Sequence, residues 1–230
     1  MKNSTLAPNG ATPLQKAVEL LRTLAGKPQK QRYADAVLRK IKRGEKHSTL
    51  GVEVRDEAYT RAKAERWLSR LVDYGLKPEH LCVEFGCGSL WAAEPVIRYL
   101  DSGRFIGLDV TDQFYEFGRQ RIGTLLREKQ VKLAVIAKPS LREIASLQPD
   151  YIYSRKVLPH VNKASLPQYM ANVASLMHPK TVAVLDNTPT FDDEGNVSGR
   201  RHTVEEMQAL LPASLEIRQE RYAAIIRHRG

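Results

Sequence analysis

Beyond Pro78, short apolar runs alternate with amphipathic segments, and this alternation limits the possible folds more than any other feature of the sequence. The runs show little polar–apolar alternation, which is typical of strands buried on both faces of a sheet. The segments between them have helical spacing, as Leu166, Met170 and Val173 illustrate. Repeated strand–helix units predict an α/β fold, doubly wound around a mostly parallel sheet. The runs are Leu81–Phe85, Arg104–Val110, Val131–Ile136, Tyr151–Tyr153 and Thr181–Leu185.

Further signals lie in the second half of this region. The segments Ser140–Glu143 and Thr203–Glu206 match the capping box that begins a helix. Near the C-terminus, an alternating segment begins at Leu215, and an apolar run follows at Ala224–Ile226. Together these two segments predict an antiparallel pair that closes the sheet.

Residues 1–77 predict a basic helical extension that caps a second part, residues 78–230. Helical spacing occurs in Leu14–Leu24, Arg32–Arg43 and Asp56–Tyr74, and Gly75 stands where a left-handed C-cap is expected. We expect these helices, and especially the third, to cover the ligand cleft and shape the acceptor pocket. The residues expected to face inward are Ala36, Val37 and Ile41 in the second helix and Ala58, Ala62, Trp67, Leu68, Leu71 and Val72 in the third.

The first apolar run leads into Gly86-Cys-Gly88, and a helical segment follows. Glycine permits a tight turn and lets a ligand approach the backbone, and the next helix offers free N–H groups to an anion. Asp109 ends the second run, 21 positions after Gly88, a spacing that suits a carboxylate accepting both ribose hydroxyls of an adenosine. The pattern therefore predicts a ligand that contains adenosine.

Two residues narrow the choice among adenosine ligands. Trp91 stands where a dinucleotide site prefers a third glycine, which disfavours a dinucleotide-dependent oxidoreductase. Glu84, just before the turn, would repel a pyrophosphate and attract an ammonium group. S-adenosylmethionine carries an amino group, a carboxylate, a sulfonium and a ribose, and it fits Glu84, the glycine turn and Asp109.

The same segments resemble a known family. Val83–Ser89 resembles the glycine motif of class I S-adenosylmethionine-dependent methyltransferases, Phe105–Asp109 resembles their second-strand motif, and Asp150–His160 looks like their fourth strand and the loop after it. The resemblance covers about residues 55–212 and departs at Leu90, where the family often has another glycine. It also departs at Ala137–Pro139, where no acid for the adenine amine is present.

This resemblance implies a seven-stranded Rossmann-like sheet with S-adenosylmethionine as the cofactor. The contacts that it implies are at Glu84, Gly86, Gly88 and Asp109, and their neighbours complete the predicted site. The predicted cofactor residues are Glu84, Phe85, Gly86, Cys87, Gly88, Ser89, Asp109, Val110 and Ser154.

The loop Ser154–Val161 should line the same cleft, because ligands bind beyond the carboxyl ends of parallel strands. His160 is the predicted catalytic base, with a purely structural histidine as the alternative. Arg155 and Lys156 would hold an anionic acceptor, or else form a solvated pair. Asn187, after the fifth run, is a further candidate for substrate binding.

Two motifs that are absent from the sequence reduce the number of possible methyl acceptors. Ser154–Val157 lacks the paired prolines typical of enzymes that methylate an exocyclic base amine. Neither cysteine, Cys82 or Cys87, lies near this loop, as a nucleophile for methylating a pyrimidine carbon would have to. The predicted acceptor is therefore an oxygen or aliphatic nitrogen of a small molecule or saccharide.

The net charge of +10 is concentrated in Lys27–Lys46, where eight basic residues stand against two acidic ones. Such a segment binds nucleic acid or forms a solvated helix face. It keeps an RNA methyltransferase as the main alternative, and a non-catalytic S-adenosylmethionine-binding regulatory protein as another. No oligomeric state follows from the sequence.

Two cysteines and six scattered histidines lack the spacing of a metal site, so no metal is expected. The N-terminus lacks a signal-peptide core, and no apolar run approaches the roughly 18 residues of a membrane span. We therefore expect a soluble cytoplasmic protein.

Overall fold

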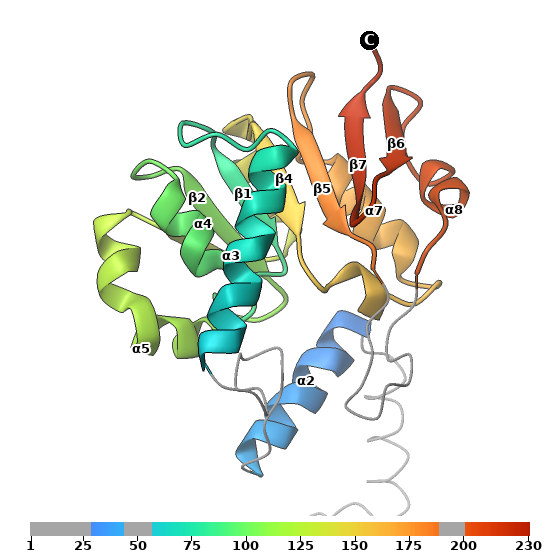
Figure 1. Cartoon of the computed structure of the whole chain (residues 1–230). Helices are drawn as coiled ribbons and strands as arrows, with labels where there is room; N and C mark the ends of the chain where they lie inside the picture. Colours follow the sequence, from blue (N-terminus) through green and yellow to red (C-terminus); the bar gives the residue numbers. More distant parts are fainter. Residues whose placement is uncertain (1–28, 44–56, 189–200) are drawn as a thin grey trace, which may run out of the picture.

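A computed structural model describes residues 29–43, 57–188 and 201–230 (Figure 1). Its centre is a seven-stranded sheet with the order β3-β2-β1-β4-β5-β7-β6. Neighbouring strands from β3 to β5 are parallel, and β7 runs antiparallel to both β5 and β6. The α/β fold, the seven-stranded sheet and the closing antiparallel pair are thereby confirmed. The strands are β1 Cys82–Phe85, β2 Phe105–Asp109, β3 Lys132–Val135, β4 Tyr151–Ser154, β5 Val182–Asp186, β6 Leu215–Gln219 and β7 Ala223–His228.

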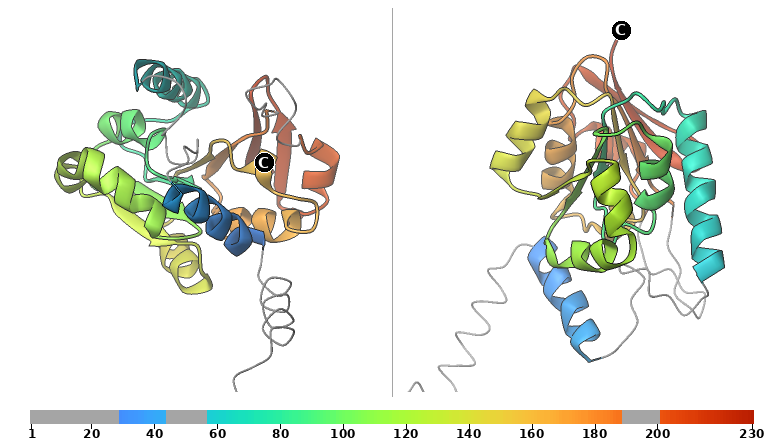
Figure 2. Two further views of the ribbon diagram at one scale, coloured as in Figure 1. Left: turned by 90° about the horizontal axis from the view of Figure 1, so that it is seen from below. Right: turned by 90° about the vertical axis from the view of Figure 1, so that its left-hand side faces the viewer.

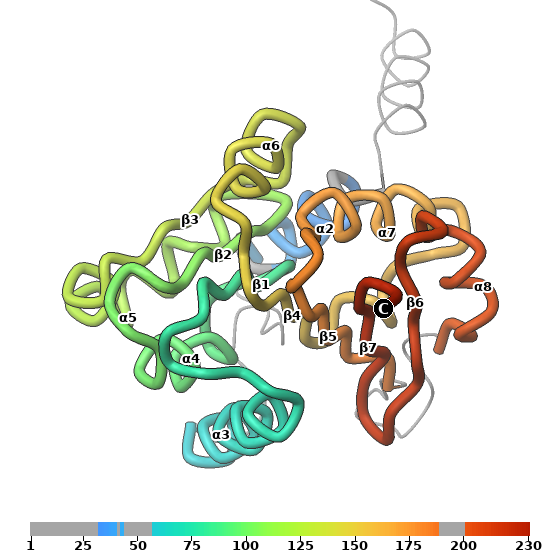
Figure 3. The backbone as a smooth tube through the Cα atoms, turned by 90° about the horizontal axis from the view of Figure 1, so that it is seen from above, coloured from blue at the N-terminus to red at the C-terminus, as the bar shows by residue number. Residues whose placement is uncertain are grey.

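Helices cover both faces of the sheet. Viewed along the strands, α3 and α4 lie on one side, and α6 and α7 lie on the other (Figure 3). Buried side chains of α5 join the core of the first face, and those of α8 join the core of the second. The helices are α2 Gln29–Lys42, α3 Glu57–Asp73, α4 Ala93–Tyr99, α5 Gln113–Glu128, α6 Lys138–Ser146, α7 Leu166–Ala174 and α8 Val204–Gln208, with a 3₁₀ turn, η2, at Leu158–His160.

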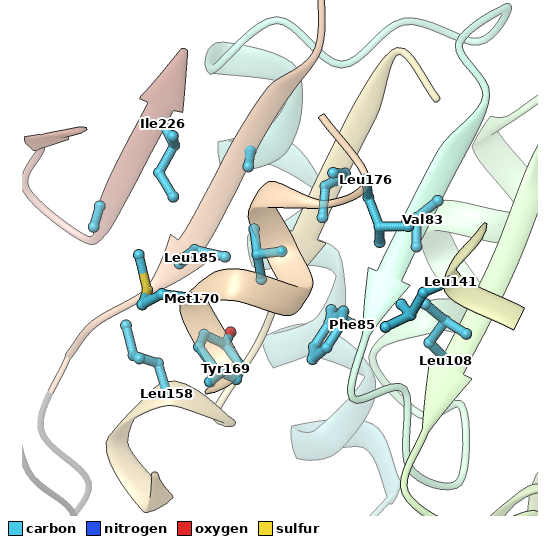
Figure 4. Packing of buried hydrophobic residues seen from close by; sticks show 14 of the residues in the cluster. Val83, Phe85, Leu108, Leu141, Leu158, Tyr169, Met170, Leu176, Leu185 and Ile226 are labelled. Atoms are coloured by element: carbon cyan, nitrogen blue, oxygen red, sulfur yellow. The ribbon is translucent and has the colours of Figure 1, made fainter. Parts of the chain in front are cut away.

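Successive residues of β1 point to opposite faces, as the period of a strand requires. Val83 and Phe85 pack in the core under α6 and α7, whereas Cys82 packs in the core under α3 and α4. Phe85 meets Tyr169 of α7 edge to face, with ring centroids 5.4 Å apart (Figure 4). This alternation turns Glu84 toward the face that carries α3, α4 and α5.

The expected position of the third helical stretch is wrong. Trp67 and Leu71 of α3 pack in the same core as α4, so α3 lies on a face of the sheet and not over the cleft. Ala58 and Val72, expected to face inward, are exposed. The left-handed C-cap at Gly75 is confirmed by its φ of 99°.

It is α2 that lies across the carboxyl edge of the parallel strands (Figure 2). Ala34 and Val37 of α2 form a small buried cluster with Phe114, at the start of α5, against which Val110 also packs. Ala36 is exposed, contrary to expectation, because the inward face of α2 is set by its neighbours Ala34 and Val37. The stretch Leu14–Leu24 lies outside the described residues. The division of the chain near residue 77 stays a prediction.

Of the two predicted capping boxes, one is confirmed. Thr203 Oγ1 accepts the N–H of Glu206 at 3.1 Å, and the Glu206 carboxylate accepts the N–H of Thr203. Ser140 instead lies within the first turn of α6, where its hydroxyl accepts the N–H of Ala137. Pro139 fits that first turn, so the helix begins before Ser140.

Candidate functional site

The glycine turn after β1 is held by the end of β2. Gly86 and Gly88 have φ values of 90° and 52°, which a residue without a Cβ adopts freely. Leu108 O accepts the N–H groups of Gly86 and Cys87 at 2.7 and 3.0 Å. A Cβ on Gly86 would lie 2.3 Å from a methyl carbon of Val157, so the loop after β4 also presses on the turn. Val157 was not identified from the sequence.

Asp109 ends β2 beneath this turn and is buried. Its carboxylate accepts the N–H groups of Gly88 and Val110, each at 2.6 Å. A carboxylate has about four lone-pair sites, so about two remain for ligand hydroxyl groups. Burial raises the pKa of Asp109 to about 6, although the two backbone donors act to lower it. The carboxylate is therefore mostly ionised at neutral pH.

The side chain of Tyr115 forms a hydrogen bond with the backbone of Asp109. Its hydroxyl accepts the Asp109 N–H at 2.8 Å and donates to Ala134 O at 2.5 Å, which joins the ends of β2 and β3. Burial raises the pKa of Tyr115 well above its ordinary value, so this hydroxyl keeps its proton. This role could not be predicted from the sequence, because a tyrosine near a helix start is common.

Glu84 lies in β1 beside Tyr153 of β4 and Gly107 of β2. Only 1% of its surface is exposed, and burial raises its pKa to about 8, against lowering contributions from Tyr153 and the Arg155 guanidinium. The Tyr153 contact does not meet hydrogen-bond geometry: Glu84 Oε2 and Tyr153 OH have no partner among the described residues. A buried carboxyl oxygen without a hydrogen-bond donor is costly, and a cationic ligand group would satisfy it.

Three other predicted cofactor residues, Phe85, Cys87 and Ser89, have buried side chains. The side chains of Phe85 and Cys87 belong to the two cores of the sheet. A Cβ on Gly107 would lie 2.9 Å from Cys87 Sγ, so this sulfur sits directly on β2. Burial raises the pKa of the Cys87 thiol well above its ordinary value, so it is not a nucleophile. Ser89 is also buried.

The loop after β4 brings the predicted acceptor residues to the same edge. Ser154 Oγ is buried without a hydrogen-bond partner among the described residues, and Lys156 is exposed in a left-handed conformation. His160, in η2, stacks on Tyr33 of α2 with ring centroids 6.2 Å apart. Partial burial and the Lys156 charge lower the pKa of His160. His160 is therefore neutral near pH 7, as a base must be.

The side chain of Asn187 forms hydrogen bonds within the protein. Its side-chain nitrogen donates to His202 O at 2.8 Å and to Gln219 Oε1 at 3.2 Å, and its oxygen accepts the His202 N–H. These bonds join the end of β5 to the segment before α8 and to the end of β6. The predicted substrate contact of Asn187 stays a prediction.

The site lies where the strand order reverses, because β1 is flanked by β2 on one side and β4 on the other. Open parallel sheets bind ligands at this switch point. A separate hollow of about 600 Å³ lies between α3, α4 and α5, lined by five arginines and three glutamates among other residues. In the described part of the chain, no helix has the length and apolarity for a membrane span, and no cluster of three or more metal-binding side chains occurs.

Comparison with known proteins gives matches in structure only. No family model matches the sequence, and no curated protein matches it. The magnesium protoporphyrin IX methyltransferase of Synechocystis, solved with bound S-adenosylmethionine, is 18% identical over 72% of this chain and 77% of its own, with a TM-score of 0.51.

Two other solved methyltransferases are similar to this chain in structure. A S-adenosylmethionine-dependent methyltransferase from Anabaena variabilis is 17% identical over 68% of this chain and 80% of its own, with a TM-score of 0.53. Human N-acetylserotonin methyltransferase, in complex with S-adenosylmethionine, is 14% identical over 78% of this chain and 58% of its own, with a TM-score of 0.50. The chain thus has the fold of the class I S-adenosylmethionine-dependent methyltransferases.

Proposed function

We propose that this protein is an enzyme that transfers the methyl group of S-adenosylmethionine to an oxygen or aliphatic nitrogen of a small-molecule or saccharide acceptor. The observation that carries the proposal is the pair of buried carboxyl groups, those of Glu84 and Asp109, on either side of a glycine turn at the switch point of the sheet. The fold shared with methyltransferases of known structure supports the same reading.

The residues fit the cofactor group by group. Asp109 keeps about two lone-pair sites for the ribose hydroxyls. Glu84 Oε2, which has no hydrogen-bond partner among the described residues, would accept a hydrogen bond from the ammonium of the methionine part. Trp91, which stands where a dinucleotide site prefers a third glycine, disfavours a dinucleotide at this turn.

When bound, S-adenosylmethionine supplies a methyl group that is already activated by the sulfonium. The chain then has to orient the acceptor in line with that methyl group and exclude water. Helix α2 is placed to do this, because it spans the carboxyl edge from Val110 to His160. His160, neutral near pH 7, would take the proton from an attacking hydroxyl group.

The acceptor pocket is proposed to lie between the loop after β4 and α2. Lys156 is exposed there and would attract an anionic group of the acceptor. Arg155 acts on Glu84 through its charge, which places it on the cofactor side of the loop. An anionic small molecule or saccharide fits this distribution of charge.

A second candidate, RNA methylation, is favoured by one observation. The outer face of α2 and the residue after it carry exposed basic side chains, at the carboxyl edge of the parallel strands. Such a face binds polyanions through their phosphates, and the binding weakens steeply with salt. These residues are Arg32, Arg39, Lys40, Lys42 and Arg43.

Titration calorimetry with S-adenosylmethionine tests the cofactor. Asp109→Ala removes charged hydrogen bonds to the ribose, so binding should weaken by about 1.5–3 kcal/mol. Asp109→Asn keeps the shape and part of the hydrogen bonding, and should lose less. A folded Asp109→Ala variant that binds as tightly as the wild type would overturn the assignment.

A further inference from the structure

Leu90, two residues after Gly88, has a left-handed backbone with φ of 64°. Glycine adopts this conformation freely, but a residue with a Cβ does so only where its surroundings hold it there. The Leu90 side chain is fully buried in the core beneath α4. The end of the cofactor turn therefore depends on contacts made to Leu90.

Helix α5 supplies contacts to Leu90 from two of its turns. At Gly118, an added Cβ would lie 2.7 Å from Leu90 Cδ1 and 2.9 Å from Ser89 O, so α5 touches the turn only because glycine stands there. One turn further along, Arg121 Nη2 donates to Leu90 O at 3.1 Å. The same carbonyl accepts the N–H of Glu94 at 3.0 Å. Arg121 thus holds the left-handed residue by its backbone.

The side chain of Arg121 is itself held in place by Glu94 and Trp91. Its Nη1 pairs with Glu94 Oε2, and its guanidinium lies 3.8 Å above the Trp91 ring. The side chains of Arg121 and Glu94 are only 21% and 9% exposed. The α5 backbone leaves helical geometry at the next residue, Ile122. Arg121 also lines the arginine-rich hollow. Its Nη1 and Nη2 groups, however, bind Glu94 and Leu90 O inside the protein, so we assign Arg121 a structural role and not a contact with a ligand.

Arg98 offers a matched comparison. It pairs with the other oxygen of the same carboxylate, Glu94 Oε1, at 2.8 Å, but its side chain is 57% exposed. Burial acts to raise the pKa of Glu94, and hydrogen bonds from Arg98 and Arg121 outweigh it, so the pKa is lowered and Glu94 stays ionised. Both arginines therefore form ion pairs with Glu94, whereas Arg121 also donates a hydrogen bond to Leu90 O.

We propose that Arg121 is a positioning residue for the cofactor: by holding Leu90 O, it keeps the glycine turn in the shape in which the Gly88 N–H meets the Asp109 carboxylate, beside the proposed ligand site. This proposal rests on the proposed function for its link to S-adenosylmethionine. It does not require Arg121 to touch the cofactor or the acceptor.

Three variants separate the backbone bond from the ion pair. Arg121→Lys keeps a charge for Glu94 but loses the planar fork that reaches both Glu94 and Leu90 O. Arg121→Met removes both contacts, and Arg98→Met removes only the exposed half of the ion pair. Hydrogen–deuterium exchange of residues 88–93 in the unliganded protein reports the shape of the turn. Titration calorimetry measures how far a change in the turn alters the affinity for S-adenosylmethionine.

Both Arg121 variants should exchange about tenfold faster at the turn and bind S-adenosylmethionine about tenfold more weakly, the cost of a hydrogen bond to a charged group. Arg98→Met should match the wild type within about twofold in both measurements. If Arg121→Lys behaves like the wild type, or if Arg98→Met does as much damage, the proposal is overturned. Should Arg121→Met not fold, Arg121→Lys carries the comparison alone.

The two measurements also separate this proposal from the proposed function. Exchange is measured without ligand, so it decides the role of Arg121 even if the wild type fails to bind S-adenosylmethionine. A wild type that binds, with exchange and affinity unchanged in Arg121→Lys, refutes the positioning role alone.

Discussion

Binding of S-adenosylmethionine should release a proton from Glu84. Burial raises the pKa of this carboxyl to about 8 in the unliganded protein. At pH 7 about nine molecules in ten therefore carry the proton, from the usual relation between pH and pKa. A cationic ligand beside the carboxyl favours its charged form, so the pKa falls on binding. The expected release is about 0.9 proton per cofactor bound at pH 7.

Asp109 adds little to this count. Its pKa of about 6 leaves about one molecule in ten protonated at pH 7, so it contributes about 0.1 proton. Glu84→Gln removes the titrating group but keeps its shape, and should reduce the release to about that residual value. Glu79→Gln, an exposed residue before β1, is the matched control and should release as the wild type does.

Calorimetry in two buffers of different ionisation enthalpy, such as phosphate and Tris, measures the release as the slope of the observed enthalpy. Affinity should also rise with pH from about 6 until the ligand's amino group, whose ordinary pKa is about 7.7–8.0, begins to lose its proton, because the ionised carboxyl pairs with the cation. A wild type that binds S-adenosylmethionine with a slope of zero would refute the pairing of Glu84 with a cationic group. An equal slope in Glu84→Gln would refute it as well.

The remaining predictions concern the acceptor side and the fold. His160→Ala should reduce turnover by about 10²–10⁴ with cofactor affinity nearly unchanged, and should remove a pH–rate inflection below the ordinary histidine value, since the pKa of His160 is lowered; a loss under about fivefold with an unaltered profile would leave His160 a structural role. Fluorescence anisotropy should show no sub-micromolar binding of RNA at physiological salt, and a tight affinity that falls with salt and is lost when Lys40, Lys42 and Arg43 are neutralised would instead favour the RNA alternative. Asn187→Ala should lower the free energy of unfolding in urea by about 1–3 kcal/mol, because it leaves buried partners unsatisfied, with cofactor affinity unchanged; full stability would contradict the structural role of Asn187. In the unliganded protein, stability should fall as pH rises from about 4.5 through about 8, because the folded state holds the Glu84 proton more tightly than the unfolded chain does; Glu84→Gln should lack this part of the pH dependence, and an unchanged dependence would place the effect elsewhere.

The strands and the cofactor turn could be predicted from the sequence because their signals are local. Each buried strand is a short apolar run, and Gly86 and Gly88 mark the turn within three residues. The confirmed capping box at Thr203 and Glu206 is local too. By contrast, Ser140 begins a segment with the same pattern, but Pro139 lies in the first turn of the helix, which therefore starts before Ser140.

What the sequence did not predict depends on contacts between distant segments. Arg121 meets Leu90 across 31 positions, and Tyr115 meets the backbone of both β2 and β3. No periodic pattern encodes such bonds, because they depend on how closely α5 approaches the turn. The wrong position expected for α3 has the same cause: α2 and α3 are both amphipathic, and only packing decides that α2 lies over the cleft while α3 lies on a face of the sheet.

A crystal structure of the protein with S-adenosylhomocysteine, the demethylated product, tests the central claim most directly. We predict the ribose hydroxyls within hydrogen-bond distance of Asp109, the ammonium at Glu84, and the sulfur facing the space between the loop after β4 and α2. A ligand bound elsewhere, such as in the arginine-rich hollow between α3, α4 and α5, would contradict the account. So would crystals grown at saturating ligand in which Asp109 and Glu84 make no contact with it.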